Sequence, residues 1–356
     1  MAGSEATRRE VLKLLTAAPL VAGRRLSAAQ VAPASAEKRT RLCLVSRHLQ
    51  WTNMEEAVAV AAEAGCKAIS WTVRAGAHIL PTNVERDLPK AVDLARKAGL
   101  DAPMLITALN EGTSERAEAI LDTMRGVGIR YYRAAPFRYD YSGDLAQQIE
   151  ALKPRISSLV RLNEKYGATA MYHTHSAYGL IGGGVWDLWM AVKDFDPQSV
   201  GLNYDLAHAT IRGGTGWIET SHLAHKFVHG LSVKDFRWVK SGTSTAARAI
   251  GAGRRGGRPP ADAPPRAPWT PEMVPGGEGM VDFQGMLSYF KSVGFAGPVE
   301  LYQEYSVRVP GVTEPVNMLG TDYGKWKLEM AKADYIALLS RDVNFYTKAL
   351  TESGLV

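Results

Sequence analysis

Short apolar runs alternate with longer segments of helical periodicity along the chain from residue 41 onward. Such runs indicate strands, and the periodic segments between them indicate amphipathic helices. The segment 53–65, for example, begins at Asn53 and stops at Gly65, as helices commonly do. Eight strands are predicted, at residues 41–49, 68–74, 101–109, 131–137, 168–175, 200–208, 228–236 and 297–305.

The order of these elements predicts the fold class. Strands that alternate with helices pair in parallel through right-handed crossovers, which indicates an α/β protein. A helix followed by glycine and a strand recurs along the sequence, and eight β/α units favour a single-domain (β/α)8 TIM barrel. The alternative is an open doubly wound sheet, which would carry a glycine-rich phosphate loop after its first strand. The residues at and after the end of the first predicted strand read SRHLQWTN and contain no glycine, so this alternative is disfavoured.

Two segments depart from this alternation and set the expected domain limits. Residues 1–36 contain Arg8 and Arg9, a short apolar stretch and a PASA site, which together predict a twin-arginine export signal. Its removal would leave a barrel domain at 37–356 in the periplasm or outside the cell. Residues 240–276 are rich in Gly, Pro, Ala and Arg, and predict an insertion after the seventh strand. It would be either a solvated basic loop or a contact for an anionic substrate.

The charge of the chain is concentrated in these two segments. The net charge is +6, of which residues 1–36 carry +3 and residues 240–276 carry +4, so the remainder is close to neutral. This balance argues against a broad basic surface for nucleic acid. Beyond residue 36 no apolar run is long enough to span a membrane. Cys43 and Cys66 are too few for a disulfide framework and are expected to be buried thiols.

Polar and aromatic side chains gather at the predicted strand ends, where a barrel holds its catalytic groups. They are His48, Trp71, Arg74, Asn110, Glu111, Arg133, Arg138, His173, His175, Asp205, His208, Lys234, Asp235, Glu300 and Glu304. Residues two apart on a strand share a face, so His173 would lie beside His175 and Asn203 beside Asp205. Imidazole and carboxylate groups from separate strands suit Mn, Fe, Co or Zn. A structural ion-pair network would use the same residue types, and Asp205 could simply cap a helix.

Four segments in this order resemble the sugar phosphate isomerase/epimerase group of xylose isomerase-like TIM barrels, which also includes endonuclease IV. They are NYDLAHA (203–209), LSVKDF (231–236), PGGEGMVDF (275–283) and GFAGPVELYQEY (294–305). The resemblance implies a divalent ion held by Glu, Asp, His and Glu from four strands. The two glutamates would also act as acid and base, while the ion stabilises an enediolate.

Several family positions are substituted in this chain. Asp205 stands at the Asp position with His208 as its companion, and His173 and His175 stand where the family has Glu-x-His. Ser232 replaces the ligand His, and Tyr302 falls at the final Glu, between Glu300 and Glu304.

The resemblance therefore implies a rearranged site with a Mn, Zn, Fe or Co ion. The predicted metal ligands are His173, Asp205 and Glu304, and the predicted catalytic residues are Lys234, Glu304 and His208. The predicted substrate-binding residues are His175, His48, Trp71, Arg133 and Glu300.

These observations predict an exported isomerase, epimerase or related lyase that removes a proton next to the carbonyl of a sugar or keto-sugar. Its partner would be a small carbohydrate, and the sequence is compatible with a homo-oligomer. A non-catalytic carbohydrate-binding barrel with a degraded metal site is the alternative. An abasic-site endonuclease follows from the fold relatives alone, and near-neutral charge and the export signal oppose it.

Overall fold

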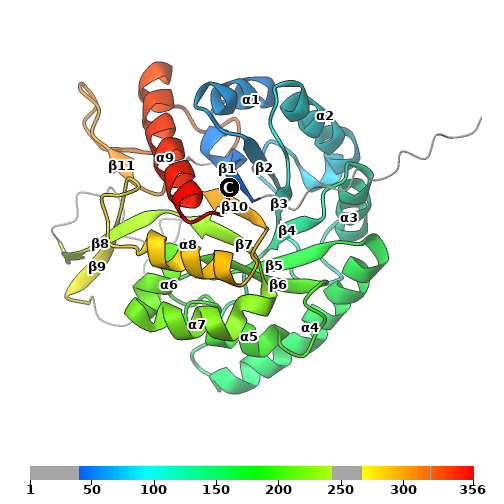
Figure 1. Ribbon diagram of the computed structural model, residues 1–356. Helices are drawn as coiled ribbons and strands as arrows, with labels where there is room; N and C mark the ends of the chain where they lie inside the picture. The colour runs from blue at the N-terminus through cyan, green and yellow to red at the C-terminus, as the bar shows by residue number, and fades with distance from the viewer. Residues whose placement is uncertain (1–39, 243–266, 321) are drawn as a thin grey trace, which may run out of the picture. The chain divides into compact units, whose positions relative to one another are not determined.

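Eight parallel strands close into a barrel in the order β1–β10–β7–β6–β5–β4–β3–β2, with helices outside them (Figure 1). The computed structural model describes residues 40–242 and 267–356 except residue 321; the predicted signal 1–36 lies outside this range. The closed barrel confirms the predicted (β/α)8 fold. The barrel strands are β1 Arg41–Val45, β2 Ala68–Val73, β3 Met104–Thr107, β4 Tyr131–Ala134, β5 Thr169–His173, β6 Val200–Asp205, β7 Val228–Val233 and β10 Pro298–Leu301.

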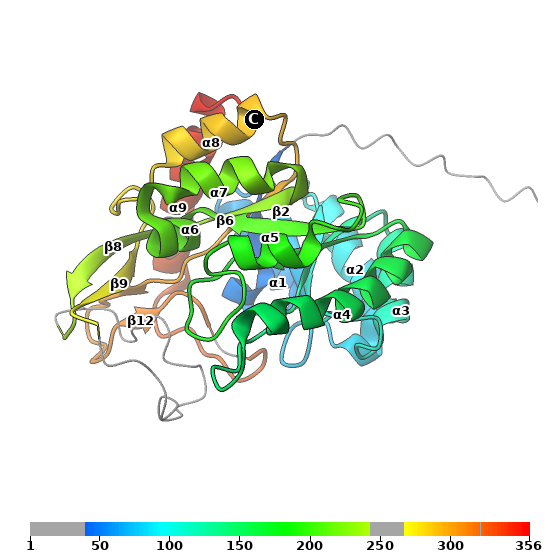
Figure 2. The same cartoon turned by 90° about the horizontal axis from the view of Figure 1, so that it is seen from below.

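Helices follow the strands and cover the outside of the barrel (Figure 2). Asn53 and Asp144 each accept a backbone N–H three residues on, so they cap the first turns of α1 and α4. Gly167 ends α4 with φ 67°, a conformation that favours glycine. The α-helices are α1 Met54–Glu63, α2 Val84–Lys97, α3 Ala117–Gly126, α4 Leu145–Tyr166, α5 Trp186–Val192, α6 Leu206–Gly213, α7 Trp217–Ala224, α8 Phe283–Ser292 and α9 Lys332–Glu352, and the short 3-10 helices are η1 Ser46–Leu49, η2 Pro81–Asn83, η3 Gly214–Gly216 and η4 His225–Phe227.

The strand register brings polar side chains together in the lumen. Glu300 is paired with Cys43 on one side and Ser232 on the other, and Ser232 is paired with Asp205. Register partners in a sheet point to the same side, so these residues form one row inside the barrel. The main hydrophobic core lies between strands and helices. The lumen therefore holds the polar chemistry.

The strands are shorter at their C-terminal ends than predicted. β1 stops at Val45 and η1 follows, which places His48 in a 3-10 turn. β5 stops at His173, so His175 is not a strand residue, and β6 stops at Asp205, where α6 begins. The prediction overran because the first turn of α6 is as buried as a strand: Leu206 is fully buried. An apolar run alone does not distinguish the two.

The region after the seventh strand also differs from the prediction. The predicted strand 228–236 is split at Lys234, and the chain continues as β8 Asp235–Lys240, which leaves the barrel (Figure 1). β8 pairs antiparallel with β9 Trp269–Val274. Part of the predicted insertion 240–276 is therefore a strand, while residues 243–266 lie outside the described residues. A second hairpin joins β11 Ser306–Val307 to β12 Val316–Asn317.

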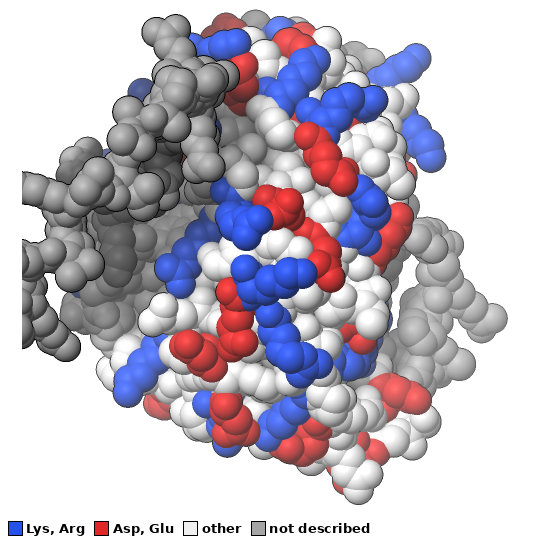
Figure 3. Space-filling model, turned by 90° about the vertical axis from the view of Figure 1, so that its right-hand side faces the viewer, with Lys and Arg blue, Asp and Glu red and all other residues white. Residues whose placement is uncertain are grey.

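Charged side chains of both signs alternate over the face shown in Figure 3. Ion pairs join neighbouring helices of the outer layer, for example Arg116 with Glu85 and Lys165 with Glu118. Exposed pairs of this kind contribute little stability individually, but they leave this face without a patch of one sign. None of the helices within the described residues combines the length and the apolar character needed to cross a membrane.

Candidate active site

Three side chains at the C-terminal end of the barrel are placed to share one ion. His173, Asp205 and His208 each offer a ligand atom, and these atoms lie within 4.8 Å of one another. His173 Nε2 is 3.5 Å from Asp205 Oδ2, and His208 Nε2 is 4.0 Å from the same oxygen. All three residues are buried. The group combines two predicted metal ligands with His208, which was predicted to be catalytic.

The sequence DLAH explains how Asp205 and His208 come together. Asp205 ends β6 and caps α6, because its Oδ1 accepts the backbone N–H of His208 at 2.9 Å. Both a capping role and a ligand role are therefore open to one carboxylate, since Oδ2 faces the two imidazoles. Ser176 Oγ lies 2.8 Å from His208 Nδ1, which turns Nε2 toward Asp205.

A hydrogen-bond chain fixes the ring of His173. Asn203 Nδ2 donates to Glu300 Oε2 at 3.0 Å, and Asn203 Oδ1 lies 3.0 Å from His173 Nδ1. An amide oxygen can only accept, so Nδ1 of His173 carries the proton and Nε2 keeps its lone pair. Ser232 Oγ also donates to Asn203 Oδ1, at 2.6 Å. The chain from Glu300 thus presents an unprotonated nitrogen toward Asp205.

Lys234 places a positive charge against the same carboxylate. Its Nζ lies 3.0 Å from Asp205 Oδ2, 3.3 Å from Glu304 Oε1 and 5.0 Å from the centre of the Tyr302 ring. Lys234 is only 2% exposed. Burial raises the pKa of Asp205 to about 6, although the Lys234 ammonium opposes that rise. The cluster therefore already holds one cation.

The imidazoles of the cluster are neutral at neutral pH. Burial lowers the pKa of His173 and His208 well below the ordinary value, and the charges of Lys234 and Arg133 lower it further. His175 stacks on His208 at 4.0 Å between ring centres, and its Nδ1 accepts the N–H of Ala177. Neutral imidazole is the form that binds metals.

The donor set fits a divalent transition metal. Among the described residues, His208 Nε2 is buried without a hydrogen-bond partner, and Asp205 Oδ2 is buried with the Lys234 ammonium as its ion-pair partner but without a hydrogen bond of regular geometry. Buried polar atoms normally have hydrogen-bond partners, so the free Nε2 of His208, 4.0 Å from the Asp205 carboxylate, indicates a place for a ligand. Two imidazoles and one carboxylate suit Zn, Fe, Mn or Co. Glu304, which was also predicted to be a ligand, does not belong to this group of three and contacts Lys234.

Arg133 and Glu300 lie deeper in the lumen. Arg133 Nη1 is 3.3 Å from Glu300 Oε2 and also donates to the hydroxyl of Tyr302. Glu300 is fully buried, and burial raises the pKa of its carboxyl while Arg133 lowers it. Arg133 retains 14% side-chain exposure, so it can reach a ligand, whereas Glu300 acts through its neighbours.

Two predicted substrate-binding residues do not contact the group of His173, Asp205 and His208. Trp71 is fully buried in the hydrophobic core between strands and helices, with its ring against His78. His48 is also fully buried, and both its ring nitrogens are used: Nδ1 faces Met318 O at 3.2 Å, and Nε2 accepts the N–H of Gln303. The His48 ring nevertheless packs edge-on against Tyr302, with 5.7 Å between the ring centres, so it lies beside the site, whereas Trp71 faces away from it.

Asn203 and Tyr302 belong to the site but were not among the predicted site residues. Asn203 lies two residues before Asp205 on the same strand, and this spacing could have shown that the two side chains share a face. The centre of the Tyr302 ring lies 5.0 Å from Lys234 Nζ and 5.2 Å from the guanidinium carbon of Arg133. The sequence could have pointed to Tyr302, because it stands at a position where the family has Glu.

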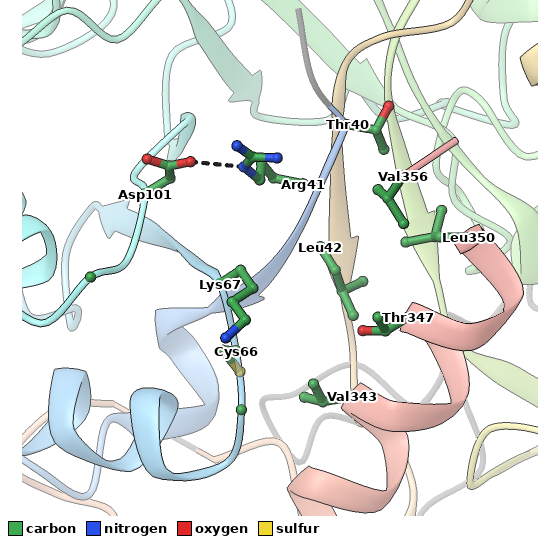
Figure 4. A pocket seen from close by; sticks show the side chains of 12 residues that line it. Thr40, Arg41, Leu42, Cys66, Lys67, Asp101, Val343, Thr347, Leu350 and Val356 are labelled. Carbon is green, nitrogen blue, oxygen red and sulfur yellow. Dashed lines mark hydrogen bonds and ion pairs between the residues drawn. The ribbon is translucent and has the colours of Figure 1, made fainter. Parts of the chain in front are cut away.

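Two cavities lie away from the cluster. One of about 370 Å³ lies at the N-terminal end of β1, between this strand and α9, and is lined by Leu42, Cys66 and Leu350 among others (Figure 4). The second, of about 240 Å³, lies beside β9 and is lined by Arg237, Glu272 and Arg341 among others. Neither contains His173 or Asp205. We assign the site from the convergence of buried polar groups, since catalytic groups of a TIM barrel lie at the opposite end from the first cavity.

Known proteins share this architecture. The chain matches the family model of the xylose isomerase-like TIM barrel over residues 58–319. A D-allulose 3-epimerase from Methylomonas sp., in complex with D-allulose, is 14% identical over 87% of this chain and 98% of that chain, with a TM-score of 0.54. The IOLI protein with a binding zinc atom is 14% identical over 88% of this chain and 99% of that chain, with a TM-score of 0.59.

A xylose isomerase-like TIM barrel protein from Mycobacterium smegmatis in complex with magnesium is 12% identical over 88% of this chain and 97% of that chain, with a TM-score of 0.58. At these identities the likeness to the solved structures shows the fold alone. No curated protein sequence is significantly similar to this one. The family model covers well over half of the chain, and the closed barrel agrees with it, so the chain belongs to the xylose isomerase-like TIM barrel family.

Proposed function

We propose that this protein is an isomerase, epimerase or related lyase that removes a proton next to the carbonyl of a sugar or keto-sugar. The observation that carries the proposal is the gathering of two imidazoles and one ammonium around one carboxylate. Asp205 Oδ2 faces two neutral imidazoles and the Lys234 ammonium, and Lys234 also contacts Glu304. This combination provides a cation for a developing negative charge and a carboxylate for the proton.

His173, Asp205 and His208 would hold the divalent ion. Such an ion, when bound, polarises a carbonyl oxygen and stabilises the charge that develops on it. His173 is oriented for this role by Asn203, as its Nε2 lone pair faces Asp205. Hydrogen bonds to the second nitrogen of a ligand histidine commonly fix its orientation in this way.

Glu304 and Lys234 would handle the proton and the charge. Glu304 is 18% exposed on its side chain and lies at the open side of the cluster, where it would take the proton from the carbon next to the carbonyl. The electron pair moves onto the carbonyl oxygen, to which the Lys234 ammonium donates a hydrogen bond. Return of the proton to the former carbonyl carbon, while the neighbouring hydroxyl proton moves to the former carbonyl oxygen, gives an isomer. Delivery of a solvent-derived proton to the opposite face of the first carbon by a second acid gives an epimer. Loss of a neighbouring hydroxyl would instead give a lyase product.

Exchange of solvent deuterium into the substrate tests the proposal. We would incubate the protein with Mn, Zn, Fe or Co and a panel of aldoses, ketoses and 3-keto sugars, and follow deuterium incorporation. Glu304→Gln is expected to lose exchange, whereas Glu278→Gln, on an exposed carboxylate paired with Arg341, is the matched control. Absence of exchange with every sugar would contradict the proposal. Tight sugar binding without exchange or metal would favour the non-catalytic carbohydrate-binding barrel.

Metal content tests the ligand assignment separately. Elemental analysis of the purified protein is expected to find about one ion per chain, and His173→Ala and Asp205→Ala are expected to lose it, because each removes one of three ligands. Retention of the metal in both variants would refute the assignment.

A further inference from the structure

Arg74, the residue that follows β2, has an unmatched hydrogen-bond donor. Its guanidinium makes no hydrogen bond or ion pair with any described residue, and its Nε is completely buried. A guanidinium has five N–H donors, and burying one of them without an acceptor is unfavourable. The conformation is therefore suited to an acceptor supplied from outside the described chain.

The strand register places Arg74 at the mouth of the lumen. Thr72 faces the interior, where its hydroxyl meets Ser46, and Arg74 lies two residues on, so it shares that face. Thr72 is in register with Ile106, and Ile106 with Arg133. Arg74 is therefore one layer closer than Arg133 to the C-terminal end of the barrel. This is the end at which Asp205 and Lys234 meet.

The other two cations of this end are already matched. Arg133 contacts Glu300, and Lys234 contacts Asp205 and Glu304. Burial and the nearby charge of Arg133 lower the pKa of Arg74 to about 10, so its charge is retained at neutral pH. Glu300 raises the pKa of Arg74 in the opposite direction, but no described carboxylate of this end forms an ion pair with its guanidinium. The N–H groups of Arg74 therefore remain available to donate to the oxygens of a ligand.

We propose that Arg74 binds an oxyanion substituent, a carboxylate or a phosphate, of the substrate whose carbonyl is processed at Lys234. The inference rests on the proposed function and adds the substrate class: a sugar with a negative charge away from its carbonyl. A guanidinium suits either oxyanion, because its parallel N–H groups form paired hydrogen bonds with two oxygens.

Calorimetric binding tests this inference without requiring turnover. D-glucose, D-glucuronate and D-glucose 6-phosphate differ only at carbon 6, so they separate a neutral sugar from a carboxylate and a phosphate. We expect one or both anions to bind about 10- to 100-fold more tightly than glucose, the range of one charge-assisted hydrogen bond. The preferred anion identifies the source of the oxyanion.

The variants Arg74→Gln and Arg74→Lys distinguish a specific contact from general attraction. Arg74→Gln should abolish the preference for the anion, and Arg74→Lys should keep part of it, while Arg161→Gln on the surface should not change it. Without ligand, Arg74→Gln should melt at the same or a higher temperature, because it removes a buried N–H donor that has no acceptor among the described residues. The melting curve also verifies that the variant folds.

Equal binding of the three sugars by the unmodified protein, or an anion preference that survives in Arg74→Gln, would overturn the inference. Deuterium exchange into neutral sugars would in that case still support the proposed function. Conversely, anion binding through Arg74 without any exchange would leave this site in place and refute the enzyme.

Discussion

Lys234→Met is the most informative single change in the cluster. It keeps the length of the side chain and removes an ammonium that lies 3.0 Å from Asp205 Oδ2. Asp205 is fully buried, so no solvent can replace the lost charge. Removing one partner of a buried ion pair typically costs about 3–5 kcal/mol of stability, because the other charge is left uncompensated. We expect a loss of that size at pH 7.5 in the metal-free protein.

The loss should depend on pH in a defined direction. The native pKa of Asp205 is about 6, above its ordinary value of 3.8, so the folded state binds this proton more tightly than the unfolded state. The carboxylate therefore destabilises the fold by about 3 kcal/mol above pH 6, and that penalty disappears as the pH falls toward 3.8. Lys234→Met raises the native pKa further. At pH 5, where Asp205 is mostly protonated in the parent as well, the loss should be smaller than at pH 7.5 by up to about 2 kcal/mol.

Urea denaturation at pH 5.0, 6.0 and 7.5, in the presence of a chelator, measures these differences. Lys193→Met is the matched control: this lysine is 37% exposed on its side chain and pairs with Asp194, so its loss should cost less than about 1 kcal/mol at every pH. Added zinc should increase the free energy of unfolding of Lys234→Met more than that of the parent, because the ion replaces the missing positive charge. An equal loss at pH 5.0 and 7.5 would show that packing, and not charge, determines the role of Lys234.

Three further predictions concern other parts of the barrel. Asn203→Leu should give a mixture of His173 tautomers in nitrogen-15 NMR spectra and weaken metal binding by about 10- to 100-fold, whereas a single Nδ1–H tautomer in the variant would contradict the role of Asn203. Gly279→Ala should lower the free energy of unfolding in urea by at least about 2 kcal/mol, because the added Cβ would collide with Asp235. The control Gly126→Ala has open space around its Cβ and should stabilise α3 by up to about 1 kcal/mol, so equal effects of the two changes would argue against the collision. Cys66 should react with iodoacetamide only after denaturation, since burial raises the pKa of its thiol to about 12, and rapid labelling of the native protein at pH 8 would show that this is wrong.

The arrangement of the elements was readable from the sequence because it depends on neighbouring residues. Apolar periodicity distinguishes a strand from a helix, and Asn53 and Asp144 mark helix starts through contacts three residues away. The shared face of Asn203 and Asp205 also follows from strand geometry alone. These local rules were sufficient for the (β/α)8 barrel and for the end of it that holds the polar side chains.

The role of each side chain within that end required the closed barrel. His48 looked available to a substrate, but its ring nitrogens meet Met318 and Gln303, which are 270 and 255 residues away in sequence. Trp71 points to the helices, and the predicted ligand Glu304 contacts Lys234. Strand ends and their loops are not constrained by a repeating pattern, so their partners are decided only when distant segments close around one lumen. The sequence by itself thus determined the barrel and its polar end, while the tertiary structure decided that His173, Asp205 and His208 meet there and that Arg74 is left without a partner among the described residues.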